Sequence, residues 1–166
     1  NKLHFPFNIR PLMAVWNMMF LDKGTQRPDA SKPAEWNRGA YLVEGLGHCG
    51  ACHTPRNKLG GPKEKLALQG GRFSTWFAPD ITPNQRTGIG GWKPEELARF
   101  LRDGRNVHTL ATGEMGEMVA YSTSQMTPGD VRAIAAYLRS LPASPQAEAR
   151  AAPSAALMKQ GEAVWR

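Results

Sequence analysis

Two cysteines and a histidine stand close together in the pentapeptide CGACH, at positions 49 to 53. If this segment is helical, Cys49 and Cys52 lie about one turn apart, so both sulfur atoms reach one edge of a porphyrin and can form thioethers with its vinyl groups. His53 follows directly and can turn its imidazole under the iron as an axial ligand. The pattern therefore predicts one covalently bound haem c, attached through Cys49 and Cys52 and ligated by His53.

Other chemistries also use paired cysteines, and the rest of the sequence helps to choose between them. A structural zinc site needs four ligands, usually in two separated pairs, but the chain has only two cysteines, and its other histidines, His4, His48 and His108, are scattered. A thioredoxin-like redox pair requires a βαβ context, which the sequence lacks. Chance occurrence of so short a pattern is the remaining alternative. Short helical patterns, a Gly- and Pro-rich middle and downstream methionines favour haem.

Short helices are predicted on both sides of this motif. One covers residues 33–46 and ends at glycines just before the first cysteine, and another covers residues 94–101, with acidic residues in its first turn. The clearest helix is the last, in which Thr127 is a good N-cap, Pro142 stops the chain and the apolar positions repeat with helical spacing: Val131, Ile134, Ala135, Leu138 and Leu141. Residues 54–91 contain Gly and Pro throughout and are predicted to be loop with at most short turns, and no stretch alternates as a strand does.

The two ends of the chain differ from this middle. Residues 3–21 form the most apolar stretch, and after Pro11 they predict a short helix that packs within the chain or under another domain, a partner or a membrane surface. About ten residues cannot span a bilayer. No charged leader precedes this stretch, so a targeting segment is expected to be absent or already removed. Residues 142–156 are rich in Ala and Pro without periodicity and are predicted to be a linker.

Composition bounds the class of protein. The 166 residues suit one domain of ordinary size, and 41% hydrophobic residues are too many for a disordered chain. With 17 Gly and 13 Pro, the chain is too interrupted for a long helical bundle. No run approaches the roughly 20 apolar residues that cross a membrane. The net charge of +7 permits nucleic acid, anionic lipid or an acidic protein as partner. With a haem domain as the interpretation, no nucleic-acid partner is expected.

The order of these features resembles a class I cytochrome c domain: helix, CxxCH, long loop, helix, methionine loop and capped final helix. Four stretches carry a closer likeness: YLVEGLGHCGACHTPRN, LQGG, APDITPNQRTGIGGWKPEELARFLRDGRN and MGEMVAYSTSQMTPGDVRAIAAYLRSLP. Over about residues 36–142 they resemble a haem domain, the middle one, of the multi-haem cytochrome c subunits of periplasmic, membrane-associated dehydrogenases of the alcohol, aldehyde and gluconate type. The resemblance implies an all-α, class I cytochrome c-like fold, with short helices and long loops around the haem.

A methionine is expected as the second axial ligand, because an iron whose six ligands do not change reorganises little on electron transfer, and a Met sulfur raises its potential. The downstream candidates are Met115, Met118 and Met126, with His108 an outsider. The resemblance implies Met115, since it stands where the family's ligand precedes small, acidic and apolar residues. Met118 stands where the family more often has valine, and Met126 fits a hydrophobic staple before the Thr127 cap. Core filling is the alternative role for each methionine.

Three further residues are predicted around the haem. Pro62, in the segment GGP, is placed as in cytochromes c whose proline carbonyl accepts the second ring N–H of the ligating histidine and so sets its tautomer. Trp76 and Trp92 flank the middle loop and are expected to pack on the haem, and the indole N–H of Trp92 is free to reach a propionate. Ordinary core packing is the alternative for both tryptophans.

The C-terminal segment LMKQGEAVWR places Gly161 four residues before Trp165. In many c-type domains a glycine and an aromatic residue with this spacing precede the first cysteine, so the segment resembles the start of a next haem domain. The expected layout is an apolar connector from a preceding domain over residues 1–30, a haem domain over 31–142, and a linker with the start of another haem domain over 143–166. The alternative is a frayed tail on a stand-alone mono-haem cytochrome.

Together these features predict an electron carrier, since no catalytic acid or base can be named. The haem is expected to relay electrons from a periplasmic dehydrogenase or a neighbouring haem towards quinone or another acceptor. The expected partners are a dehydrogenase catalytic subunit, neighbouring haem domains or another cytochrome. This type of haem attachment takes place across the membrane, so the periplasm is the expected compartment, and membrane-surface contact stays open. The alternative is a haem enzyme or gas sensor with an open axial position, similar to a peroxidase.

Overall fold

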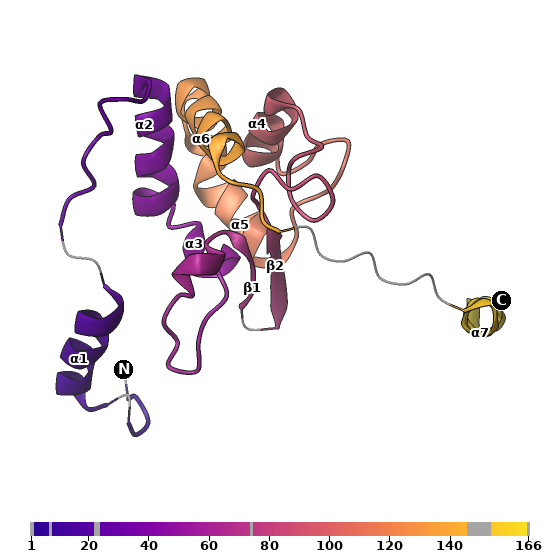
Figure 1. Cartoon of the computed structure of the whole chain (residues 1–166), viewed down its shortest axis with the longest axis horizontal. Coiled ribbons are helices and arrows are strands. Elements are labelled where there is room, and N and C mark those ends of the chain that lie inside the picture. The colour runs from indigo at the N-terminus through magenta and orange to yellow at the C-terminus, as the bar shows by residue number, and fades with distance from the viewer. Residues whose placement is uncertain (1, 7, 22–23, 74, 146–153, 166) are drawn as a thin grey trace.

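The computed structural model describes residues 2–6, 8–21, 24–73, 75–145 and 154–165. Within these ranges the chain is mainly helical, with one small β-hairpin (Figure 1). The helices α2 (Ala34–Ala40), α4 (Pro94–Asp103) and α6 (Pro128–Ser140) contribute most of the buried apolar core. The predicted class I cytochrome c-like, helical architecture is confirmed, with the addition of the hairpin.

Helices α2 and α6 form the most extensive helix contact within the described ranges, and their ribbons lie side by side in Figure 1. Gly39 allows the close approach, because a β-carbon built there would lie 2.0 Å from the carbonyl oxygen of Ala133. Next to it the rings of Trp36 and Tyr137 meet edge to face, with centroids 5.1 Å apart. The indole N–H of Trp36 also donates to the Ser140 hydroxyl over 2.6 Å. A glycine and two aromatic rings thus set this helix crossing.

Helix α6 begins where the sequence predicts. Thr127 Oγ1 accepts a hydrogen bond of 3.2 Å from the backbone N–H of Asp130, and Pro128 takes the first helical position. The Asp130 carboxylate binds the Arg38 guanidinium of α2 through contacts of 2.7 and 3.0 Å, and this hydrogen bonding lowers the pKa of Asp130. The N-terminal cap of α6 is therefore also a link to α2.

Helix α4 also begins at the predicted proline and runs two residues beyond the predicted end, to Asp103. The carboxylate of Glu96 accepts the backbone N–H of Lys93 over 2.8 Å, which satisfies a donor that the first turn would otherwise leave free. Gly104 ends the helix in the left-handed region, with a φ of 70°. Local capping chemistry therefore explains both ends.

The helix predicted over residues 33–46 is present, but its second half is a π-helix, η1 (Tyr41–Leu46). The backbone N–H of Gly47 donates to the carbonyl of Leu42 over 2.7 Å, five residues back along the chain. A β-carbon at Gly47 would lie 2.7 Å from that same carbonyl oxygen, so the chain needs a glycine here. The π-helix leads directly into the cysteine motif.

The prediction that residues 54–91 contain loop with at most short turns is wrong, because strands β1 (Gln69–Phe73) and β2 (Trp76–Asp80) form an antiparallel hairpin. A short 3-10 turn, η2 (Glu64–Leu66), precedes them. The strands carry no alternating pattern because β1 packs through its backbone: a β-carbon at Gly71 would lie 2.7 Å from the carbonyl oxygen of Cys52. The glycines that suggested a loop are what lets the strand lie against the cysteine motif.

The methionine loop expected between α4 and α6 is also largely helical. It contains α5 (Gly113–Tyr121) and the 3-10 turn η3 (Thr123–Gln125). Its start carries two poor helix formers, Gly113 and Gly116, and Gly113 has a φ of 55°. Packing against other elements, not local preference, therefore makes this segment helical.

The apolar N-terminal stretch forms α1 (Arg10–Phe20), as predicted, and none of its residues is buried. Two side chains bind it to the loop after the cysteine motif: the Trp16 indole N–H donates to the Leu59 carbonyl over 2.9 Å, and the Phe20 ring lies against Gly61. Intramolecular packing thus covers only part of this helix. Nowhere in the described ranges does a helix combine the length and apolar character needed to cross a membrane.

The predicted linker after α6 is partly outside the described residues, which resume at residue 154. Its first residues pack against the domain, because Ser144 is buried and hydrogen bonded to Asp80 and to the loop that follows β2. Beyond residue 153 the chain forms α7 (Ala155–Trp165), which stands apart from the other helices in Figure 1. Gly161 and the backbone of Trp165 both belong to this helix.

Candidate haem-attachment site

The cysteine motif occupies one short helical turn. Helix α3 (Gly50–His53) is preceded by Cys49 as its N-cap residue, and the backbone N–H of His53 donates to the Cys49 carbonyl over 3.0 Å. Cys49 and Cys52 are both half-buried, and their thiols are not joined in a disulfide. Two free thiols one turn apart, with a histidine at the end of the same turn, match the predicted arrangement for thioether attachment of haem.

The imidazole of His53 is held from the second strand of the hairpin. Its Nδ1 lies 2.7 Å from the carbonyl oxygen of Pro79. A carbonyl only accepts hydrogen bonds, so Nδ1 carries the proton and Nε2 keeps its lone pair for a metal. The prediction that the Pro62 carbonyl accepts this bond is wrong: Pro62 instead lies opposite Arg56 in an isolated bridge of the preceding loop. The hairpin, which the sequence did not predict, is what brings Pro79 to the histidine.

The electrostatics of the motif suit a metal ligand better than a redox thiol. Burial lowers the pKa of His53, even though the bond to Pro79 acts in the opposite direction, so the ring stays neutral at neutral pH. Burial and the charge of Glu44 raise the pKa of Cys49 to about 11. A reactive thiol of a thioredoxin-like pair has a lowered pKa, which is the opposite shift. Across the described ranges, no group of three or more His, Cys, Asp or Glu side chains is gathered as metal ligands, as a zinc site would require.

Strand β2 leads from this histidine towards the methionines. Pro79 lies near its end, and Trp76, at its start, places its indole against Gly113, where a β-carbon would lie 2.6 Å from the ring. Three residues of strand span about 10 Å. Met115 is two residues beyond Gly113 in the same helix, α5, and is partly buried against the core. One strand therefore connects the histidine side of the site with the first turn of α5.

The other candidate ligands have different surroundings. Met126 also packs against the core, directly before the Thr127 cap, and Met118 is half-buried on α5. His108 is already engaged, because its Nε2 lies 3.0 Å from a carboxylate oxygen of Glu96. A neutral imidazole, two thiols and thioether sulfur together form the donor set that haem c requires, so the residues present fit this group.

Trp92 is surrounded by side chains other than the cysteine motif. Its ring is stacked on His108 with centroids 5.1 Å apart and planes inclined by 7°, and it meets Phe100 edge to face. The guanidinium of Arg139 donates to its backbone carbonyl. These contacts correspond to the core-packing alternative, and contact between Trp92 and haem stays a prediction.

Sequence reasoning missed a group of polar residues directly after Pro79. Asp80 is buried, and its carboxylate accepts hydrogen bonds from Thr82, Thr87 and Ser144. Burial raises the pKa of Asp80, but these hydrogen bonds together outweigh it, and the net pKa is lowered. An acidic residue followed by threonines in a Pro-rich segment was the available signal, since such a carboxylate needs nearby donors if it is buried.

The lowered pKa of Asp80 predicts acid sensitivity. A carboxyl group with a lower pKa in the folded protein contributes stability above its unfolded pKa of about 4 and loses that contribution as the pH falls through the folded value. We expect Asp80→Asn to lower the free energy of unfolding by about 2 kcal/mol at neutral pH. The difference in free energy of unfolding between Asp80→Asn and the wild type should shrink below about pH 4. Urea unfolding over a series of pH values measures this difference.

Asp103→Asn is the matched control, because Asp103 also has a lowered pKa but pairs with Arg102 at the surface. An exposed pair contributes little, so this variant should follow the wild type closely at every pH. Parallel curves for Asp80→Asn and the wild type would contradict the assignment of acid sensitivity to Asp80.

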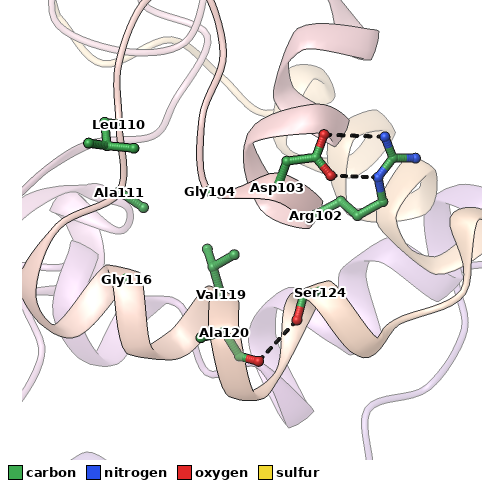
Figure 2. Close-up of a pocket in the computed structure, with 9 residues that line it drawn as sticks. All are labelled: Arg102, Asp103, Gly104, Leu110, Ala111, Gly116, Val119, Ala120 and Ser124. Carbon is green, nitrogen blue, oxygen red and sulfur yellow. Dashed lines mark hydrogen bonds and ion pairs between the residues drawn. The ribbon is translucent and has the colours of Figure 1, made fainter.

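A cavity of about 340 Å³ lies between the end of α4, the loop after it and α5. Figure 2 shows the residues that line it. Gly104, Leu110, Gly116 and Val119 line it, and the paired side chains of Arg102 and Asp103 lie at its edge, 2.9 Å apart. No Cys, His or Met contributes to its lining. This cavity is therefore separate from the candidate haem ligands.

The helical fold and the CxxCH turn with its anchored histidine define a c-type cytochrome domain. Residues 34–138 match the family described as cytochrome c oxidase, cbb3-type, subunit III, and the chain belongs to this family of cytochrome c domains. Membership implies haem c as the cofactor and electron transfer as the general function.

Curated relatives contain this region within longer proteins. A nicotinate dehydrogenase subunit of Pseudomonas putida is 44% identical over the whole chain, which covers 14% of that protein. The fructose dehydrogenase cytochrome subunit of Gluconobacter japonicus is 40% identical over 86% of the chain and 29% of its own length. The alcohol dehydrogenase (quinone) cytochrome c subunit of Gluconobacter oxydans is 38% identical, over 87% and 32%. The chain thus spans less than a third of these relatives, and the predicted likeness to dehydrogenase cytochrome subunits is confirmed.

Proposed function

We propose that this chain carries a single haem c, bound by thioethers from Cys49 and Cys52, with His53 and Met115 as axial ligands, and transfers electrons one at a time. The observation that carries the proposal is the contact of 2.7 Å between His53 Nδ1 and the Pro79 carbonyl. It leaves Nε2 of a neutral ring free beside two unpaired thiols on the same turn. When bound, haem supplies the Fe(III)/Fe(II) couple, and the chain supplies ligands and orientation.

The domain itself has no catalytic step in this proposal. A methionine at the sixth position leaves no coordination site for a substrate, and unchanged ligation keeps the reorganisation on electron transfer small. Met115 is preferred because the Trp76 ring, at the start of β2, packs against the first turn of α5, from which Met115 projects.

The electrons are proposed to come from the catalytic subunit of a dehydrogenase or from a neighbouring haem, and to pass towards quinone or another acceptor in the periplasm. The names of the fructose and alcohol dehydrogenase relatives support a dehydrogenase as donor, and the second also names quinone. Because the chain corresponds to less than a third of each relative, we propose that it works beside further haem domains, with residues 1–30 as a connector and residues 143–166 as a linker and the start of the next haem domain.

One preparation tests the core of this proposal. The chain is expressed in a periplasmic cytochrome c maturation host, and its intact mass and reduced absorption spectrum are measured. The expected result is the mass of the polypeptide plus one haem, retained after denaturation, with the narrow bands of a six-coordinate c-type haem. Cys49→Ala with Cys52→Ala is the control and should lose the covalent haem. Wild-type protein that binds no haem under these conditions would overturn the proposal, and the intact mass of the natural protein tests the number of haems.

A further inference from the structure

Asp80 occupies an unusual place, because it ends strand β2 directly after the proline whose carbonyl holds His53. Its side chain is buried, with 8% of the residue exposed. Its carboxylate accepts three hydrogen bonds: from the Ser144 hydroxyl at 2.5 Å, the backbone N–H of Thr82 at 2.7 Å and the Thr87 hydroxyl at 2.9 Å. Three donors on one carboxylate fix its position tightly.

Ser144 reaches this carboxylate from the other end of the domain, four residues after α6. Its backbone N–H donates to Thr82 Oγ1 over 3.0 Å, and its carbonyl accepts from the Asn84 side chain over 2.9 Å. The loop between is closely packed, since a β-carbon at Gly88 would lie 2.2 Å from the Thr82 carbonyl oxygen. Ser144, Asp80 and the loop after β2 therefore form one hydrogen-bonded unit.

Pro79 lies in β2 between two residues that pair with β1, Ala78 opposite Gly71 and Asp80 opposite Gln69. As a proline it has no N–H to donate to the neighbouring strand, and it is exposed at the surface. It lines a cavity of about 430 Å³ together with Phe77, Asp80 and Ser144. Its neighbour on the C-terminal side is Asp80, so the hydrogen bonds of the Asp80 side chain act together with the strand pairing to hold the peptide that carries the Pro79 carbonyl.

We propose that Asp80 and Ser144 are positioning residues for the haem ligand: through Pro79 they hold the carbonyl that accepts the His53 Nδ1 proton, and thereby tune the reduction potential of the iron. This inference rests on the proposed function, because it requires His53 to be the ligand. A hydrogen bond from the second ring nitrogen makes a ligating imidazole more electron-donating, which favours the ferric iron. Loosening Asp80 weakens that bond and raises the potential.

The main test is Ser144→Ala in the haem-loaded chain, since it removes one hydrogen bond from Asp80 without changing any charge. The expected results are a positive shift of the midpoint potential in a redox titration and, with Met115→Ala added to open the sixth position, a lower iron–histidine stretching frequency in resonance Raman spectra of the five-coordinate ferrous form. Thr87→Val, at an exposed position, removes another donor to the same carboxylate and should shift both quantities in the same direction. It gives a result even if Ser144→Ala does not fold.

Ser140→Ala is the matched control. Ser140 accepts a hydrogen bond of 2.6 Å from Trp36 at the contact between α2 and α6, so its loss should lower stability and leave the potential unchanged. Haem-loaded Ser144→Ala and Thr87→Val with the potential of the wild type, and with the stretching frequency of Met115→Ala alone when each is combined with it, would overturn the inference while leaving the proposed function intact. A chain without covalent haem would instead overturn the proposed function.

Discussion

Replacing Met115 with alanine is expected to let the reduced protein bind carbon monoxide, about one molecule per haem, where the wild type binds little. Alanine has no sulfur lone pair, so the sixth position of the iron becomes available to an external ligand. The midpoint potential should fall, because a methionine sulfur favours the ferrous iron. Titration with carbon monoxide, followed by absorption spectroscopy, measures the first effect, and a redox titration measures the second.

Two matched variants, Met118→Ala and Met126→Ala, decide whether Met115 is the ligand. Met118 lies one turn further along α5, and Met126 is partly buried against the core before α6. Both variants should keep the six-coordinate spectrum, although Met126→Ala removes core volume and is expected to lower stability by about 3 kcal/mol. Carbon monoxide binding confined to one of these variants would move the assignment to that methionine. Strong binding by the wild type would favour the enzyme or gas-sensor alternative.

Gly39→Ala is expected to lower the free energy of unfolding by about 3 kcal/mol. The added methyl group would lie 2.0 Å from the Ala133 carbonyl oxygen and 2.7 Å from Cβ of Tyr137. Both neighbours belong to helix α6, whose backbone cannot move without separating the whole contact between α2 and α6. The loss should appear as a lower urea midpoint for the haem-loaded chain, without a change in slope.

Gly129→Ala is the control, because it makes the same chemical change in the first turn of α6. There the new methyl group would have the Thr127 hydroxyl at 3.8 Å as its nearest neighbour, an ordinary contact. Alanine also has the better helix propensity, so stability should be unchanged or rise by less than about 1 kcal/mol. Equal losses in both variants would show that the effect comes from the loss of glycine and not from the helix contact.

Features with local causes could be predicted from the sequence. Helix α6 follows from its Thr127 cap and its apolar spacing, and α4 follows from its N-terminal proline and C-terminal glycine. The cysteine motif is equally local, because five consecutive residues contain both thiols and the imidazole. In each case the residues that cause the structure are neighbours in the chain.

The missed features have non-local causes. Strand β1 contains glycines because its backbone lies against the carbonyls of Cys52 and Thr54, and helix α5 starts at a glycine that the Trp76 ring covers. For the same reason, the sequence alone could not identify Pro79, instead of Pro62, as the residue whose carbonyl accepts the His53 N–H. The loop proline is closer to His53 in sequence, and only the hairpin brings the later one within hydrogen-bonding distance.

Because the π-helix η1 leads directly into the cysteine motif, the number of residues in it, and not only their types, sets the direction in which the motif faces. An insertion or deletion of one residue between Ala40 and Gly47 would rotate everything after it by about 100° around the helix axis. Helix α2 would still pack against α6, while Cys49 would face a different direction. Length variants of this segment should therefore load haem poorly, which makes chain length here a constraint on haem attachment in natural variants and engineered fusions alike.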